Sequence, residues 1–71
     1  MNGIIDESRV AANLKSARVR AGLLQADVAE RLGVSRATIV NYENEPTRMK
    51  LKTFMQLADI YGCNVSYFFG V

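Results

Sequence analysis

The sequence contains no histidine or tryptophan and only one cysteine and one proline. Without histidine the chain has no Cys/His pair for nucleophilic catalysis, and its carboxylates form no pair in an evident cleft. It shows no metal-ligand spacing and no glycine-rich phosphate loop, so we expect no enzymatic activity, metal or cofactor. Cys63 follows Gly62 at an apolar position and is expected to fill the core. A single cysteine also excludes an internal disulfide.

Long apolar runs are absent too, and none approaches the length needed to cross a bilayer. The first seven residues lack the basic and apolar regions of a signal peptide, so we expect a cytoplasmic protein. The 71 residues are sufficient for one domain, 1–71, with a thin core that a partner chain would stabilise.

The net charge is only +2, which by itself is weak support for nucleic-acid binding. The distribution is more informative, because four basic residues gather in one part of the chain: Arg36, Arg48, Lys50 and Lys52. Solvated helix faces would account for them, but their position beside a predicted exposed helix favours phosphate contacts.

Residues 25–43 predict two short helices joined by a tight turn. Small or apolar residues mark one face of the first helix: Val28, Ala29 and Leu32. Gly33 can adopt the left-handed conformation that ends a helix and turns the chain, and Val34 is expected to fill the elbow.

The second helix of this pair is expected to begin after Ser35, whose hydroxyl can cap it. Ile39 and Tyr42 then face inward, and five residues remain on the outer side: Arg36, Ala37, Val40, Asn41 and Asn44. A small residue, a glycine, a cap and an inward Ile39 in one register are typical of a helix-turn-helix, whose second helix enters the major groove of DNA. The alternative is an ordinary helical hairpin in a small bundle.

Three further helical segments are expected on either side of this pair. The first, capped by Asp6 or Ser8, runs to about Ala21 with a core stripe of Val10, Leu14, Ala17 and Ala21. Another begins near Thr47 and carries its apolar face on Leu51, Phe54, Leu57, Ala58 and Tyr61. Asn64 can cap a last short turn that holds Val65, Phe68 and Phe69. The chain is therefore predicted to be all-α, with five helices.

Two polar positions have structural consequences. Arg18 lies next to the buried stripe of the first helix and needs a carboxylate, for which Glu43 is the natural candidate unless Arg18 is solvent-exposed. Leu24 stands at the N-cap position of the second predicted helix, where a polar capping residue would be expected. The missing cap typically costs about 1 kcal/mol of stability. Asp27 in the first turn offsets part of this loss through the helix dipole.

These residues together resemble the lambda-repressor-like (Cro and phage-repressor, XRE-type) helix-turn-helix family from about Leu14 to Phe69. Three ordered groups carry the resemblance: Leu14…Arg18…Gly22-Leu23, Gln25…Ala29…Gly33-Val34-Ser35…Ile39…Glu43, and Leu57-Ala58…Tyr61-Gly62. The resemblance implies a compact five-helix domain that binds double-stranded operator DNA as a homodimer and regulates transcription. We expect a repressor on a palindromic operator.

The resemblance also implies residue roles. Four residues match positions that face or flank base edges: Arg36, Ala37, Thr38 and Asn41. Five match phosphate-binding positions: Gln25, Ser35, Asn44, Arg48 and Lys50. Gln25 is also expected to brace the reading residues, and Arg18 and Glu43 match the buried ion pair of the family. Pro46 departs from the pattern, because the family proline precedes the fourth helix, where Met49 stands here.

Two questions stay open at this stage. The apolar C-terminus suggests a dimer seam of Tyr67, Phe69 and Val71, unless a following segment of a longer protein covers these groups. An antitoxin, another protein-interaction module or a restriction-system controller would use the same fold. Arg36 and Asn41 on the exposed helix favour DNA, because both side chains suit base edges.

Overall fold

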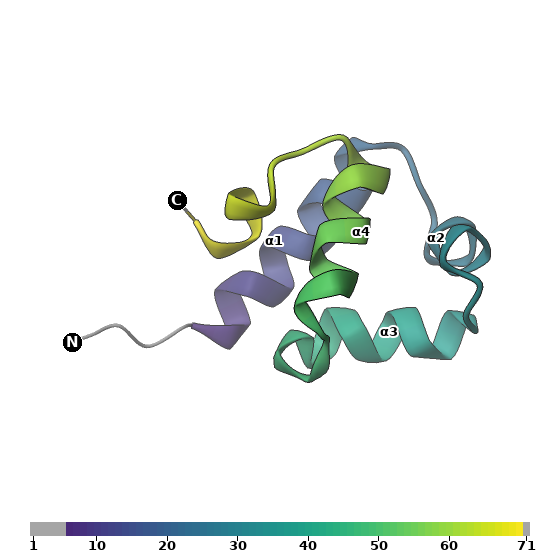
Figure 1. Ribbon diagram of the computed structural model, residues 1–71, viewed down its shortest axis with the longest axis horizontal. Helices are drawn as coiled ribbons and strands as arrows, with labels where there is room; N and C mark the ends of the chain where they lie inside the picture. Colours follow the sequence, from purple (N-terminus) through teal and green to yellow (C-terminus); the bar gives the residue numbers. More distant parts are fainter. Residues whose placement is uncertain (1–5, 71) are drawn as a thin grey trace.

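The computed structural model describes residues 6–70, which are all-helical and contain no strand (Figure 1). The elements are α1 (Glu7–Arg20), α2 (Gln25–Leu32), α3 (Arg36–Asn44), the 3-10 helix η1 (Pro46–Arg48), α4 (Leu51–Tyr61) and the 3-10 helix η2 (Val65–Phe69). Within this range no helix is long and apolar enough to span a membrane.

The described residues hold four α-helices, and the predicted fifth is the 3-10 helix η2. Asn64 caps it as expected, because its Oδ1 accepts from the Ser66 N–H at 3.1 Å. Only five residues separate that cap from Gly70, which has φ +76° and ends the turn. The predicted start near Thr47 was also wrong: Thr47 lies in η1, and the extended backbone of Lys50 separates η1 from α4.

Helix α1 begins where the Asp6 side chain accepts from the Arg9 N–H at 3.3 Å. Its buried stripe consists of Val10, Leu14 and Ala17. Ala21 was expected to extend this stripe but is exposed, because the helix ends at Arg20 and Ala21 lies in the following turn.

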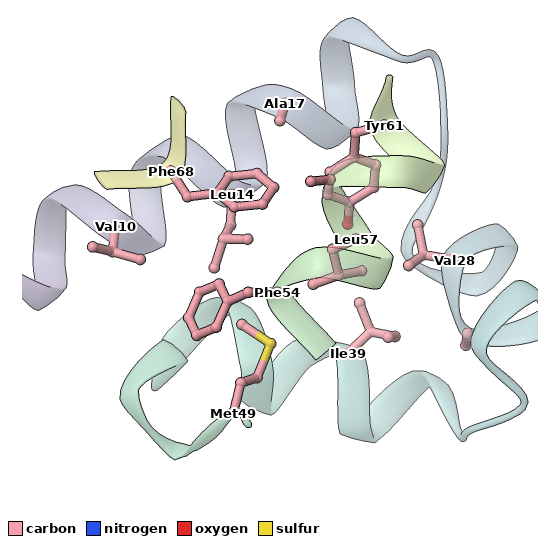
Figure 2. Close-up of a cluster of buried hydrophobic side chains, with 12 residues drawn as sticks. Val10, Leu14, Ala17, Val28, Ile39, Met49, Phe54, Leu57, Tyr61 and Phe68 are labelled. Atoms are coloured by element: carbon pink, nitrogen blue, oxygen red, sulfur yellow. The ribbon is translucent and has the colours of Figure 1, made fainter. Parts of the chain in front are cut away.

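The core lies where α1, α4 and η2 meet the backs of α2 and α3. Figure 2 shows side chains from all of these elements converging, with Phe68 completely buried. The Phe68 ring meets Tyr61 edge-on with centroids 6.3 Å apart, and it lies 6.3 Å from Phe54. Because Phe68 belongs to η2, this short 3-10 helix closes the core between α1 and α4.

The turn between α2 and α3 is a Schellman motif centred on Gly33, whose φ is +72°. The Gly33 N–H donates to the Glu30 carbonyl at 3.2 Å, and the Val34 N–H donates to the Ala29 carbonyl at 3.0 Å. Val34 was expected to fill the elbow, but its side chain is exposed. Backbone hydrogen bonds and the packing of Val28 and Ala29 therefore hold the turn.

Candidate nucleic-acid interface

Helix α3 lies along one edge of the molecule with one side against the core (Figure 1). Ser35 caps it, since its Oγ accepts from the Thr38 N–H at 3.2 Å and lies 3.0 Å from the Thr38 Oγ1. Ile39 and Glu43 are buried, and Tyr42 is half-buried. The opposite side of α3 is solvent-exposed at four polar or small residues: Arg36, Ala37, Asn41 and Asn44.

Behind α3 lies an ion pair that joins its C-terminal half to α1. The Arg18 Nε donates to Glu43 Oε2 at 2.6 Å, and a second guanidinium nitrogen donates to Glu43 Oε1 at 3.3 Å. The Arg18 side chain is only 11% exposed and that of Glu43 4%. Arg18 also donates to the Leu23 carbonyl at 3.0 Å, which ties the loop before α2 to the same pair. Such a two-point contact fixes orientation as well as charge.

Gln25 extends this contact from the core to the exposed edge of α3. Its Nε2 donates to Glu43 Oε1 at 3.1 Å, and its Oε1 accepts from Arg36 at 3.2 Å. A carboxylate only accepts and a guanidinium only donates, so the amide orientation is determined by its two partners. One Gln25 N–H remains for a further acceptor. The structure thus joins Arg18, Glu43, Gln25 and Arg36 in one hydrogen-bonded row.

Basic side chains continue beyond the C-terminal end of α3. Arg48 and Lys50 are both exposed, and Lys50 precedes an α4 N-terminus that has no side-chain cap. The first N–H groups of α4 and the positive end of its dipole therefore add to the charge of Lys50. Arg48 makes an exposed 3.6 Å ion pair with Glu45, which the sequence reading missed. Pairs so exposed are weak, and Arg48 can exchange Glu45 for another anion.

Helix α2 begins at Gln25 without a side-chain cap from Leu24, which is exposed. The Asp27 carboxylate replaces part of the missing cap, because its Oδ2 accepts from the Leu24 N–H at 2.8 Å. Gln25 is therefore held at the first position of a short helix, from which its side chain reaches Arg36.

Two titratable side chains, one buried and one half-buried, have raised pKa values. Tyr61 lies behind the ion pair, where burial and, to a lesser degree, the negative charge of Glu43 raise the pKa of its phenol to about 12. Cys63 is half-buried, and burial raises the pKa of its thiol, which disfavours the nucleophilic thiolate. Among residues 6–70 no three metal-ligating side chains cluster.

Tyr67 and Phe69, two of the three residues expected to form the dimer seam, pack against different helices. The Tyr67 hydroxyl donates to Ser16 Oγ at 3.1 Å, and its ring lies 5.7 Å from the Arg20 guanidinium, so Tyr67 is placed against α1. Phe69 instead packs on Phe54 of α4, with ring centroids 5.4 Å apart. Val71 lies outside the described residues.

Two helices joined at a Gly33 turn, with the second exposed along a polar side, define a helix-turn-helix DNA-binding domain. The family model described as Helix-turn-helix matches residues 14–68, which contain the turn, the ion pair and η2 up to Phe68. The chain belongs to this XRE-type helix-turn-helix family.

Curated relatives include both a regulator and an antitoxin. The chain is 33% identical to Antitoxin HipB of Escherichia coli K12 over 54 residues, covering 76% of this chain and 61% of the relative. It is 32% identical to the HTH-type transcriptional regulator ImmR of Bacillus subtilis 168 over 57 residues, covering 80% of this chain and 45% of the relative. The match thus spans about half the length of these relatives. No solved structure matches the chain.

Proposed function

We propose that the chain is a transcriptional repressor that binds a palindromic operator as a dimer, with α3 in the major groove of each half-site. One observation carries the proposal: the outer side of α3 is exposed while its inner side is fixed by the Arg18–Glu43 pair. A helix held from behind enters a groove without having to be ordered first, so less free energy is lost on binding.

Base reading is assigned to four residues on or beside this outer side. Arg36 suits the O6 and N7 acceptors of guanine, and Asn41 suits the donor and acceptor of adenine. Ala37 and the methyl group of Thr38 suit a thymine methyl. The Gln25 contact limits where the Arg36 guanidinium points, which favours one base position over its neighbours.

Phosphate contacts are assigned to side chains at both ends of α3. The free N–H of Gln25 and the hydroxyl of Ser35 serve the phosphates at the N-terminal end of α3. Asn44, Arg48 and Lys50 serve those at the C-terminal end, where the uncapped α4 N-terminus adds its dipole. Such contacts fix the orientation of α3 on the duplex and carry no sequence information directly.

We expect a dimer because one α3 can reach only a small number of bases. A single copy distinguishes too few base pairs to select one site among the many competing sites of a genome. Two copies on a palindrome solve this problem with half-sites about 34 Å apart, one turn of the double helix.

A second candidate, an antitoxin, has a specific observation in its favour, the similarity to Antitoxin HipB. In that case a partner protein would bind elsewhere on the domain, and α3 would remain available for DNA. A protein-interaction module without DNA binding would leave the exposed Arg36 and Asn41 without a role.

Selection of binding sites from a random DNA pool tests the proposal. We expect a palindromic consensus, and gel shifts in which the selected duplex binds more tightly than a random duplex of equal length. The random duplex is expected to bind at low salt and to dissociate as salt rises. No shift with any duplex at low salt would reject DNA binding and leave the protein-interaction role.

A further inference from the structure

A cavity of about 320 Å³ lies where the C-terminal ends of α1 and α4 meet Tyr67 of η2. In Figure 1 these two helix ends lie at the top of the molecule, whereas α3 runs along its lower edge. The volume falls within the range of about 300–1,000 Å³ that is usual for pockets holding small molecules. The cavity serves none of the proposed DNA contacts, so a ligand in it leaves the outer side of α3 uncovered.

Small residues leave the space for this cavity. Ala17, Ala21 and Gly62 belong to its lining and carry no side chain beyond Cβ. A Cβ built at Gly62 would meet no atom of a more distant described residue within 4 Å, so this side of the cavity is open. The large residues of the lining are Tyr61 and Tyr67, and Figure 2 shows Tyr61 and Ala17 at the same end of the core. Small and aromatic walls of this kind suit a flat apolar group.

Arg20 is the only charged side chain among the described residues that line the cavity. It is exposed and has no ion-pair partner within residues 6–70. Its guanidinium lies 5.7 Å from the centroid of the Tyr67 ring, a cation–π contact that limits its movement. Because this guanidinium is already positioned, it loses less rotamer freedom when it binds an anion.

The other titratable groups of the lining do not oppose a negative charge. Burial raises the pKa of the Cys63 thiol, and it raises the pKa of the Tyr61 phenol to about 12, so both groups are neutral near pH 7. Hydrogen bonds with Ser16 and Arg20 lower the pKa of the Tyr67 phenol, which means that a negative charge is favoured at its oxygen. The side chains of the cavity therefore favour an anion.

The helix ends beside the cavity reduce this preference only in part. Unsatisfied carbonyl groups at a helix C-terminus attract cations. In α4 the Gly62 N–H donates to the Asp59 carbonyl at 3.2 Å, and after α1 the Gly22 N–H donates to the Val19 carbonyl at 2.9 Å. These caps satisfy carbonyl groups of both last turns, so the full charge of Arg20 determines which ligands are attracted.

We propose that this cavity binds a small aromatic carboxylate, with the carboxylate on Arg20 and the ring in the part lined by Ala17 and Tyr61. A guanidinium meets a carboxylate at two points, which fixes the orientation of the ligand as well as its charge. An inorganic anion would pair with Arg20 and leave the apolar part unfilled, and a neutral ring would leave Arg20 unpaired. The proposal goes beyond the DNA-binding function and does not depend on it.

Titration of the 15N-labelled chain with benzoate, followed through its amide NMR resonances, tests the proposal. We expect saturable shifts at the amides of Gly62 and Cys63, which line the cavity, and smaller shifts at the Asn41 amide on α3. Benzamide has the same shape without the charge and should bind about 10-fold more weakly or worse, because it loses the charge-assisted pair with Arg20. Inorganic phosphate has the charge without the ring and should also bind more weakly than benzoate.

The variants Arg20→Gln and Arg31→Gln remove the same charge at two places. Arg31 is the matched control, because it is an exposed arginine on α2 that does not line the cavity. Arg20→Gln should raise the benzoate dissociation constant about 10-fold or more, whereas Arg31→Gln should change it less than about 2-fold. Circular dichroism confirms that both variants are folded, as expected for exposed side chains.

Four results would overturn the proposal: no saturable shifts with benzoate, shifts that do not centre on the cavity, equal affinity for benzoate and either control compound, or equal effects of the two variants. The benzamide and phosphate comparisons use the wild-type chain, so they hold even if Arg20→Gln disturbs the fold. Gel shifts with a random duplex at low salt keep the two claims separate. DNA binding without benzoate binding would reject the carboxylate site and retain the proposed function.

Discussion

At the scale of single residues, a row of four side chains connects the core to the reading edge. Arg18 and Glu43 form its buried part, and Gln25 passes the contact to Arg36 on the exposed side of α3. Each member restricts the next, so the Arg36 guanidinium is oriented through Gln25 by a buried ion pair, Arg18 and Glu43, to which no DNA contact is assigned. A buried pair of this kind serves orientation more than stability, because desolvation offsets much of the attraction.

Replacement of the ion pair separates these two effects. Glu43→Leu alone leaves Arg18 charged and nearly buried, and it is expected to lower the free energy of unfolding by about 3–5 kcal/mol. The double variant Arg18→Met/Glu43→Leu should recover most of that loss in urea denaturation, because no unpaired charge remains. A double variant as unstable as Glu43→Leu would show that the attraction itself stabilises the fold.

The raised pKa of Tyr61 predicts that the folded chain loses stability at alkaline pH. Its pKa is about 12 in the folded chain against the ordinary 10.0, chiefly because the phenol is buried. The unfolded chain loses this proton first, so the contribution to stability is fully present below pH 10 and is lost as pH rises to about 12. Urea midpoints of the wild-type chain should fall over this window by more than those of Tyr61→Phe. Parallel curves for the two would contradict the assignment.

At the scale of elements, α2 has a correctable weak point at its N-terminus. Leu24 occupies the cap position in the extended conformation that capping residues adopt, and its side chain is 68% exposed. Leu24→Ser should therefore add a cap without opening the core, which is worth about 1 kcal/mol or a rise in Tm of about 4–8 °C. Calorimetry measures the change. Leu24→Ala is the control, and an equal Tm for the two variants would contradict the capping argument.

The helices and their ends were largely predictable from the sequence, because glycines and caps act locally. Gly33 and Ser35 mark the turn and the start of α3, and Ile39 is buried as its spacing predicts. Leu51, which is exposed, was misassigned because periodicity gives the face of a helix but not what covers it. Val34 was misassigned because the turn is held by backbone hydrogen bonds rather than by this side chain. The 3-10 helix η1 (Pro46–Arg48) takes up the segment around the predicted start near Thr47, so α4 begins only at Leu51.

The site was predictable in its composition but not in its connections. The spacing places Arg36 and Asn41 on the outer side of α3, where the structure also has them. The Arg48–Glu45 pair and the path of the Gln25 amide depend on side-chain rotamers, which spacing does not specify. The packing of Tyr67 against α1 and of Phe69 against α4 was not predicted either, because spacing does not specify which helix each ring of η2 meets.

At the scale of the whole molecule, a net charge of +2 leaves DNA affinity dependent on where the charges lie. Lys50→Gln should weaken binding to operator and random duplexes alike and lower the log–log salt slope by about one unit per copy. Lys15→Gln is the control, because exposed Lys15 lies on α1 and is assigned no phosphate. Equal slopes for Lys50→Gln and the wild-type chain would remove Lys50 from the phosphate contacts.

The most direct test of the account is the ratio of affinities for operator and random duplex, measured for the wild-type chain and Arg36→Ala at one salt concentration. Arg36 is exposed, so the substitution should leave the fold intact. Loss of a bidentate base contact is expected to cost about 1–3 kcal/mol of discrimination per half-site, so operator affinity should fall far more than random-duplex affinity. An equal fall on both duplexes would contradict the claim that the outer side of α3 reads DNA sequence.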